Sequence, residues 1–163
     1  MKHFQQLLAI GLVLLLATTA HAKAAFKGKA QMIETAQAIA VVEITHTETV
    51  SVKGQHWTYQ QEASARVERV LKGTLADEVA LYGDETFICA HCHFEVGRYL
   101  VFLDHDGELL TGNNWHLSVR KITQNTVAWF ANDRDIEQKS AALSDVLQAI
   151  EWALARAKPA EPT

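Results

Sequence analysis

The chain has 163 residues, with 15 Lys and Arg against 19 Asp and Glu, which gives a formal net charge of −4. Nucleic-acid-binding proteins concentrate positive charge on one surface, and here the basic residues are few and scattered, so we expect no nucleic-acid partner. The length suits one domain with one hydrophobic core.

The N-terminal segment has the three parts of a secretory signal peptide. A positively charged start precedes an apolar run over residues 7–16, and Ala20-His21-Ala22 then supplies a small-residue cleavage site. This order is typical of signal peptides, and the apolar run is shorter than the roughly 20 residues that a membrane-spanning helix needs. We therefore expect residues 1–22 to be removed and Lys23 to begin an exported chain, periplasmic or secreted, with no stable membrane anchor.

A short helix and two strands are predicted next. Residues 26–37 are compatible with a helix, and the β-branched apolar run over 38–44 predicts a buried strand that continues to residue 52. Apolar and polar residues alternate over 57–67, which predicts a strand with one face in water; Gln61 is the one polar residue on its apolar face. The alternation slips at 69–71, where a bulge or strand end is expected before Lys72-Gly73 turns the chain.

Further short strands are predicted in the second half of the chain. The strand over 79–82 is closed by Gly83-Asp84, and the run Asp104-His105-Asp106-Gly107 predicts a hairpin turn. The remaining strand candidates are residues 98–103, 108–111, 115–122 and 126–130.

The C-terminal part changes to helical spacing. Apolar residues from Ile136 to Leu154 recur at helical intervals, which predicts an amphipathic helix packed on the sheet, with Asp135 and Gln138 as a capping box. Pro159 ends this helix, and residues 159–163 are expected to be frayed. The sequence thus predicts one domain over 23–158, mainly β with terminal helices: a small antiparallel barrel of the OB type plus a C-terminal amphipathic helix.

Four stretches carry a family pattern: residues 36–43, 65–73, 92–103 and 107–110. In the third, Cys92 comes shortly before a strand that contains Phe94, Gly97 and the run 99–102, Tyr-Leu-Val-Phe. Together they resemble the netrin-like (NTR) modules, the OB-fold family that includes tissue inhibitors of metalloproteinases and exported bacterial relatives. The resemblance covers residues 32–122 and implies a barrel with a binding role and no enzymatic activity.

Two departures limit what this resemblance implies. The family usually pairs that Cys with a later one, about where residues 113–115 stand, whereas here Cys89 is the only intramolecular partner for Cys92. Protease inhibitors of the family present an N-terminal Cys to the catalytic zinc. The expected mature chain begins at Lys23, so we do not expect this mechanism.

The run Cys89-Ala90-His91-Cys92-His93 leaves several chemistries open. In an exported protein, two nearby Cys normally form a disulfide, and a bridge that closes so small a loop stabilises modestly. The run also matches the attachment signature of c-type haem, with Cys89 and Cys92 bonded to the haem and His93 as axial ligand. A structural Cys89–Cys92 bridge without a cofactor is the leading interpretation, and haem c is the alternative.

Two further chemistries of the same run are less favoured. A redox-active Cys pair depends on a lowered thiol pKa, usually at a helix N-terminus, and here a strand follows. A zinc or copper site would need more ligands, for which His46, His56, His105 and His116 are available but not brought together by any pattern. No hydrolase, zinc-protease or phosphate-loop motif is present, so we expect a non-enzymatic module.

The loop over 83–96 is expected to carry the binding surface. Ligands of OB barrels meet one sheet face and the loops around it, and a loop pinned by a disulfide loses less entropy on binding. We predict that Phe87, His91, His93 and Trp115 form an exposed patch that contacts a protein partner. The alternative is that the two aromatic rings plug the barrel and the histidines are merely solvated.

Overall fold

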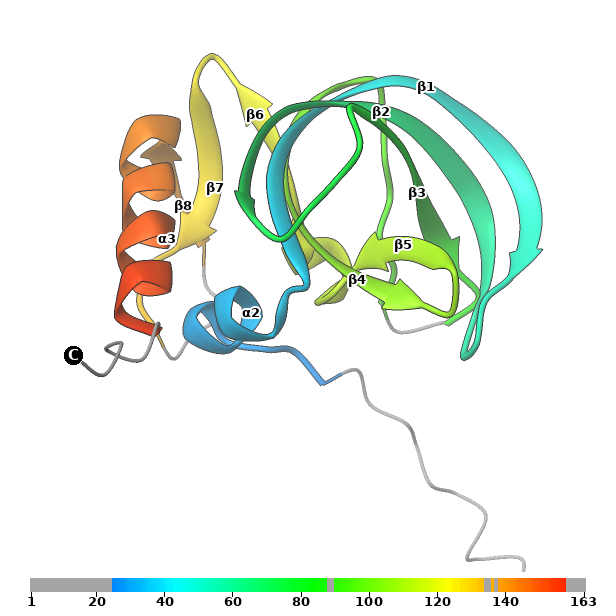
Figure 1. Ribbon diagram of the computed structural model, residues 1–163, viewed down its shortest axis with the longest axis horizontal. Helices are drawn as coiled ribbons and strands as arrows, with labels where there is room; N and C mark the ends of the chain where they lie inside the picture. The colour runs from blue at the N-terminus through cyan, green and yellow to red at the C-terminus, as the bar shows by residue number, and fades with distance from the viewer. Residues whose placement is uncertain (1–24, 88–89, 134–135, 137, 158–163) are drawn as a thin grey trace, which may run out of the picture.

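Five strands form a ring at the centre of the computed structural model, which describes residues 25–87, 90–133, 136 and 138–157 (Figure 1). Around the ring, each strand pairs with the next and the last pairs with the first. The ring strands, in that order, are β1 (Ala38–Lys53), β2 (Thr58–Lys72), β3 (Glu78–Glu85), β5 (Leu109–Gly112) and β4 (Gly97–Asp106). The β3–β5 pairing is parallel and the other four are antiparallel.

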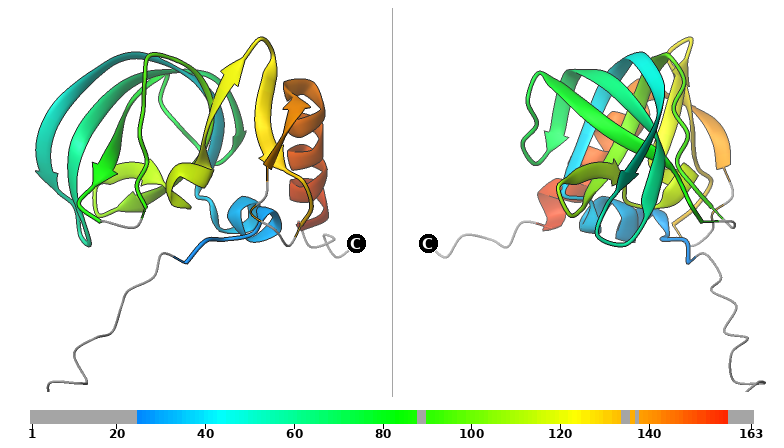
Figure 2. Two further views of the ribbon diagram at one scale, coloured as in Figure 1. Left: turned by 180° about the vertical axis from the view of Figure 1, so that it is seen from behind. Right: turned by 90° about the vertical axis from the view of Figure 1, so that its right-hand side faces the viewer.

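A smaller layer extends the ring on one side (Figures 1 and 2). After β5 a short 3-10 helix, η1 (Trp115–Ser118), leads into β6 (Val119–Thr123), which pairs with β4. Then β7 (Thr126–Phe130) and β8 (Gln138–Ala142) follow as antiparallel neighbours, and the helices α2 (Lys29–Thr35) and α3 (Leu143–Ala157) complete the layer. None of the helices in the described residues is long and apolar enough to cross a membrane.

The first half of β1 is apolar on both faces because it separates two cores. Ala38, Ala40, Val42 and Ile44 face the barrel interior with Val101 and Leu103 of β4. Ile39 and Val41 face the other way, with Leu100 and Phe102 of β4, into a second core closed by α2 and α3. The continuous apolar runs of β1 and β4 follow from this double burial.

The predicted fold class is confirmed: the chain is mainly β, with a small barrel and a C-terminal amphipathic helix. Leu143, Val146 and Ile150 are the buried side chains of α3, so the helix packs on the sheet layer as expected. The slip in β2 is a pair of register shifts, since Ile39 pairs with Lys72 but Ala40 pairs with Val70.

Two predicted turns lie later in the chain than expected, although the predicted hairpin of β4 with β5 is present. β3 does not end at Gly83-Asp84 but continues to Glu85, because the backbone of Asp84 donates a hydrogen bond to the Cys92 carbonyl (2.7 Å). A Cβ on Gly83 would lie 2.9 Å from that same carbonyl oxygen, so the glycine allows this close approach. Asp104 and Asp106 belong to β4, and the turn begins at Gly107, whose φ is +68°.

Two predicted elements are also wrong. Residues 115–118 form η1 rather than the start of a strand, and Gln138 begins β8 rather than capping a helix. Residues 138–142 pair along β7, and the helix starts only at Leu143. Pairing with a neighbouring strand thus overrides the helical spacing there. The capping partner Asp135 and the tail 159–163 lie outside the described residues, as does the predicted signal segment 1–22.

Replacing Ile150 by Ala should lower the free energy of unfolding by about 2–4 kcal/mol, because it leaves a cavity under a helix residue with no exposed surface. Gln148→Ala, at an exposed position of the same helix, should change it by less than about 0.5 kcal/mol. Denaturant unfolding of both variants measures the difference. Equal effects would contradict the packing of α3 against the second core.

Candidate functional site

A cavity of about 350 Å³ opens at one end of the barrel, where the β1–β2 connection, the ends of β3 and β4, and η1 come together. Its lining combines two tryptophan rings with several acidic and hydroxyl side chains. These lining residues are Trp57, Trp115, Tyr59, Glu85, Asp104, Asp106 and Thr111, with Ala25, Lys27, His56, His105, Gly112 and Asn113.

Asp106 is the main hydrogen-bond acceptor of this end of the barrel. Its carboxylate accepts hydrogen bonds from the backbone nitrogens of His56 (2.8 Å) and Trp57 (3.1 Å). It also accepts from His56 Nδ1 (2.7 Å) and from the Tyr59 hydroxyl (3.0 Å). Burial alone would raise the pKa of Asp106, but these donors outweigh it and hold the pKa below its usual value of 3.8. Asp106 is therefore ionised, and its carboxylate holds the β1–β2 connection in place.

Glu85 is a second buried carboxyl group on the same lining, with the opposite pKa shift. Its side chain is 6% exposed and accepts hydrogen bonds from the Cys92 backbone nitrogen (2.7 Å) and from the Thr111 hydroxyl (3.3 Å). Burial raises the pKa of Glu85 above 4.5, and the hydrogen bonds only partly counteract this. The two acids also act on Tyr59, whose pKa is raised first by burial and then by Asp106 and Glu85.

Three aromatic rings pack together beside the cavity, and we call them the aromatic cluster: Trp57, Phe87 and Trp115. Phe87 stacks on Trp115 with ring centroids 5.1 Å apart, and Trp57 meets Phe87 at 5.0 Å and Trp115 at 5.7 Å. Each ring is half-buried and comes from a different part of the chain. Three separate segments therefore combine into one partly exposed aromatic surface.

Trp115 is held in a backbone conformation that L-residues rarely adopt. Its φ is +52°, in the left-handed region. The Trp115 carbonyl accepts hydrogen bonds from the Ser118 hydroxyl (2.6 Å) and from the Cys92 sulfur (3.3 Å). Unfavourable backbone geometry of this kind persists only where the surroundings enforce it, and it clusters at binding sites.

The four residues of the predicted patch fall into two groups. Phe87 and Trp115 lie in contact, with Trp57 added to them. His91 and His93 are exposed and lie on Asp84, with His93 Nδ1 3.0 Å from the carboxylate and His91 Nε2 3.9 Å from it. The pKa of His116, next to Trp115, is lowered by burial first, then by Arg120 and by His91.

Cys92 lies in the barrel interior. It has no exposed surface and packs so closely on Gly112 that no Cβ fits there. Burial raises its pKa well above the usual value, and Glu85 adds to this, so the thiol is a poor nucleophile in this position. Cys89 lies outside the described residues, so the predicted bridge stays a prediction. Among the side chains that are described, no His, Cys, Asp and Glu group is arranged to hold a metal ion.

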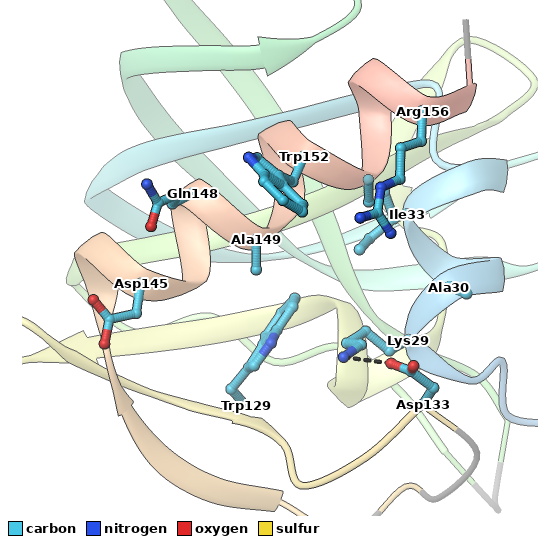
Figure 3. Close-up of a pocket in the computed structure, with 11 residues that line it drawn as sticks. Lys29, Ala30, Ile33, Trp129, Asp133, Asp145, Gln148, Ala149, Trp152 and Arg156 are labelled. Atoms are coloured by element: carbon cyan, nitrogen blue, oxygen red, sulfur yellow. Dashed lines mark ion pairs between the residues drawn. The ribbon is translucent and has the colours of Figure 1, made fainter.

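A second cavity, of about 630 Å³, lies between α2, α3 and β7 (Figure 3). Lys29 and Asp133 form an ion pair at its edge, and the Arg156 guanidinium lies 4.7 Å from the centroid of the exposed Trp152 ring. These charged groups thus already contact one another or an aromatic ring. The barrel-end cavity differs, because its buried carboxyl groups face no Lys or Arg partner among the described residues.

Sequence reasoning missed the polar half of the site. The sequence predicts Asp106 as a turn residue, and no pattern singles out Glu85 or Tyr59. One signal was present: Gln61, the polar exception on an apolar face, is buried and makes two hydrogen bonds to the Phe94 backbone (2.8 and 2.9 Å). Such an exception marks a buried side chain that fixes the path of a loop, here the one that carries His91 and His93.

No model of a known protein family matches this chain, and a search among curated proteins finds no match either.

The opposite pKa shifts of Glu85 and Asp106 predict opposite pH profiles for two variants. Native Glu85 holds its proton more tightly than the unfolded chain does, so its contribution to stability falls as the pH rises above 4.5. Glu85→Gln removes this loss. The melting temperature of the variant minus that of the wild type should therefore increase from pH 4 to pH 7.

Asp106 works the other way. Its native pKa lies below 3.8, so its stabilising effect is fully present above that value and is lost as the pH falls through the lowered pKa. The stability deficit of Asp106→Asn should therefore be about 2–3 kcal/mol at neutral pH and shrink in acid. Melting curves from pH 3 to pH 7 measure both profiles, and parallel profiles would contradict the assignment.

Proposed function

We propose that this chain is an exported binding module, with an NTR-like barrel and no enzymatic activity, that contacts a protein partner through the aromatic cluster. The observation that carries the proposal is the meeting of Trp57, Phe87 and Trp115, half-exposed, at one end of the barrel. Tryptophan is enriched among the residues that dominate binding energy in protein interfaces, and aromatic residues in general are enriched at interface centres. The positive φ of Trp115 supports the same surface.

The polar groups below the cluster support binding rather than catalysis. The Asp106 carboxylate already accepts four hydrogen bonds from the β1–β2 connection and Tyr59, which is a positioning role. Both alternative chemistries of the Cys89–His93 run, haem attachment and thiol exchange, need an accessible Cys92 sulfur. Its burial therefore favours the binding module over either one.

Site-specific photo-crosslinking tests this function. A benzophenone amino acid at Phe87 should give adducts of defined mass in the exporting organism, because the position belongs to the proposed contact surface. The matched control is the same amino acid at Trp152, an aromatic position that is 62% exposed but lies on α3. Mass spectrometry of the adducts identifies the partner.

A second change in the same chain links the adducts to the cluster. Trp115→Ala should reduce the Phe87 adducts by at least about tenfold, as expected for an interface anchor, with the melting temperature checked in parallel. No adducts from Phe87, or equal adducts from Phe87 and Trp152, would overturn the proposed surface.

Export and the Cys89–Cys92 bridge are tested on the same material. Exported protein should begin at Lys23, and peptide mapping without reductant should find the two cysteines joined, because oxidising compartments favour a nearby pair. Retention of Met1 would overturn export. Two free thiols, or haem bound through thioethers, would overturn the structural bridge.

A further inference from the structure

We propose that the barrel-end cavity receives a cationic side chain, Lys or Arg, presented by the partner protein. This inference rests on the proposed function and deepens it by giving the chemistry of the partner. It follows from the charges, the aromatic walls and the size of the cavity.

The charges around the cavity are unbalanced. Glu85, Asp104 and Asp106 line it, against Lys27 as the one Lys or Arg on its lining. Glu85 and Asp106 are 6% and 4% exposed, and neither pairs with a Lys or Arg anywhere in the described residues. Asp106 is already stabilised by its four donors, His56 among them, so Glu85 is the buried carboxyl group that lacks a cation in the described part of the chain. A cation brought by a ligand offsets the cost of burying its charge. The whole chain, at −4, also attracts a positively charged partner.

The aromatic part of the lining, which is independent of these acids, points to a cationic ligand. The Trp57 and Trp115 rings both line the cavity and meet at 68°, with centroids 5.7 Å apart. Ammonium and guanidinium groups bind aromatic rings, most favourably tryptophan.

The size of the cavity indicates a single side chain. A volume of about 350 Å³ is at the small end of ligand pockets, which suits one Lys or Arg side chain. Phe87 does not line the cavity but stacks on Trp115, so the aromatic surface continues beyond it. A free amine would leave that surface uncovered, whereas a polypeptide covers it while its basic side chain enters the cavity. We therefore assign the cation to a protein segment.

Charge-matched peptides test this assignment. We expect a short capped peptide with a central Arg to bind at least about tenfold more tightly than the same peptide with citrulline, its neutral isostere. Likewise, Lys should bind more tightly than acetyl-lysine. NMR of the indole N–H groups follows binding: the Trp57 and Trp115 signals should shift, and the signal of Trp152, on α3, should stay. Equal binding of the charged and neutral peptides, or no binding, would overturn the inference.

Variants locate the site. Glu85→Gln should weaken binding of the Arg peptide about tenfold, whereas Glu78→Gln, an exposed carboxylate on the same strand, should leave it unchanged. Trp57→Leu serves as a second variant that keeps all the acids. The melting temperature of each variant establishes that it is folded. Unchanged binding by Glu85→Gln and Trp57→Leu would overturn the assigned cavity.

The remaining arms distinguish the source of the cation and the two proposals. An alkylguanidinium that binds as tightly as the Arg peptide would overturn the assignment to a protein. Phe87 adducts together with equal binding of the Arg and citrulline peptides would leave the proposed function standing and overturn the cation. Selective binding of the Arg peptide without Phe87 adducts would leave the cation site standing and overturn the proposed contact surface.

Discussion

The antiparallel pairing of β1 with β4 is the contact on which the rest of this structure depends. It closes the five-stranded ring, from Ala38 opposite Leu103 to Ile44 opposite Gly97, and places one wall between two cores. Alternate side chains of these strands fill the barrel, and the side chains between them pack against the core under α2 and α3. Because both strands serve both cores, the barrel and the helical layer form one packed unit. The ring also brings the ends of β3 and β4 to the same edge, where the cavity lies.

At that edge, two buried acids act in different ways. Asp106 is surrounded by donors and is stabilised as an anion, so it gives the β1–β2 connection a fixed path. Glu85 holds the backbone of Cys92 and thereby the start of the segment that returns to β4, but burial disfavours its charge. Carboxyl groups thus organise the barrel end together with the aromatic cluster. Such an arrangement leaves polar groups close to a half-exposed aromatic surface.

The sequence predicts the barrel strands well because their signals are local. The apolar runs of β1 and β4 and the alternation in β2 follow from which faces are buried, which is visible in the residue types. β8 is different: residues 138–142 carry helical spacing, and only the neighbouring strand β7 makes them extended. A single sequence does not reveal such pairing partners, since they depend on the tertiary fold.

The same reasoning explains what could be predicted of the site. The combination of Phe87 with Trp115 follows from the expected barrel, in which the stretch 113–115 lies near the loop over 83–96. Trp57, Tyr59 and Asp106 come together only through the closure of the ring, because 47 residues or more separate the first two from Asp106 at the end of β4. Asp106 also stands beside Gly107, and a turn explains an Asp-Gly pair on local grounds alone. When a local pattern already explains a residue, the sequence gives no sign of its long-range contacts.

The Asn114 side chain gives the N-terminal segment a fixed course, with consequences for handling the protein. Its amide exchanges two hydrogen bonds, each of 2.8 Å, with the backbone of Lys27, as a neighbouring strand would. Ala25 and Lys27 consequently stand at the rim of the cavity. An affinity tag or fusion partner joined just before them would therefore be attached next to the cavity. The C-terminal end of α3 lies in the helical layer, away from the β4–β5 hairpin (Figures 1 and 2), and is the better position for attachment to a tag, a label or a sensor surface.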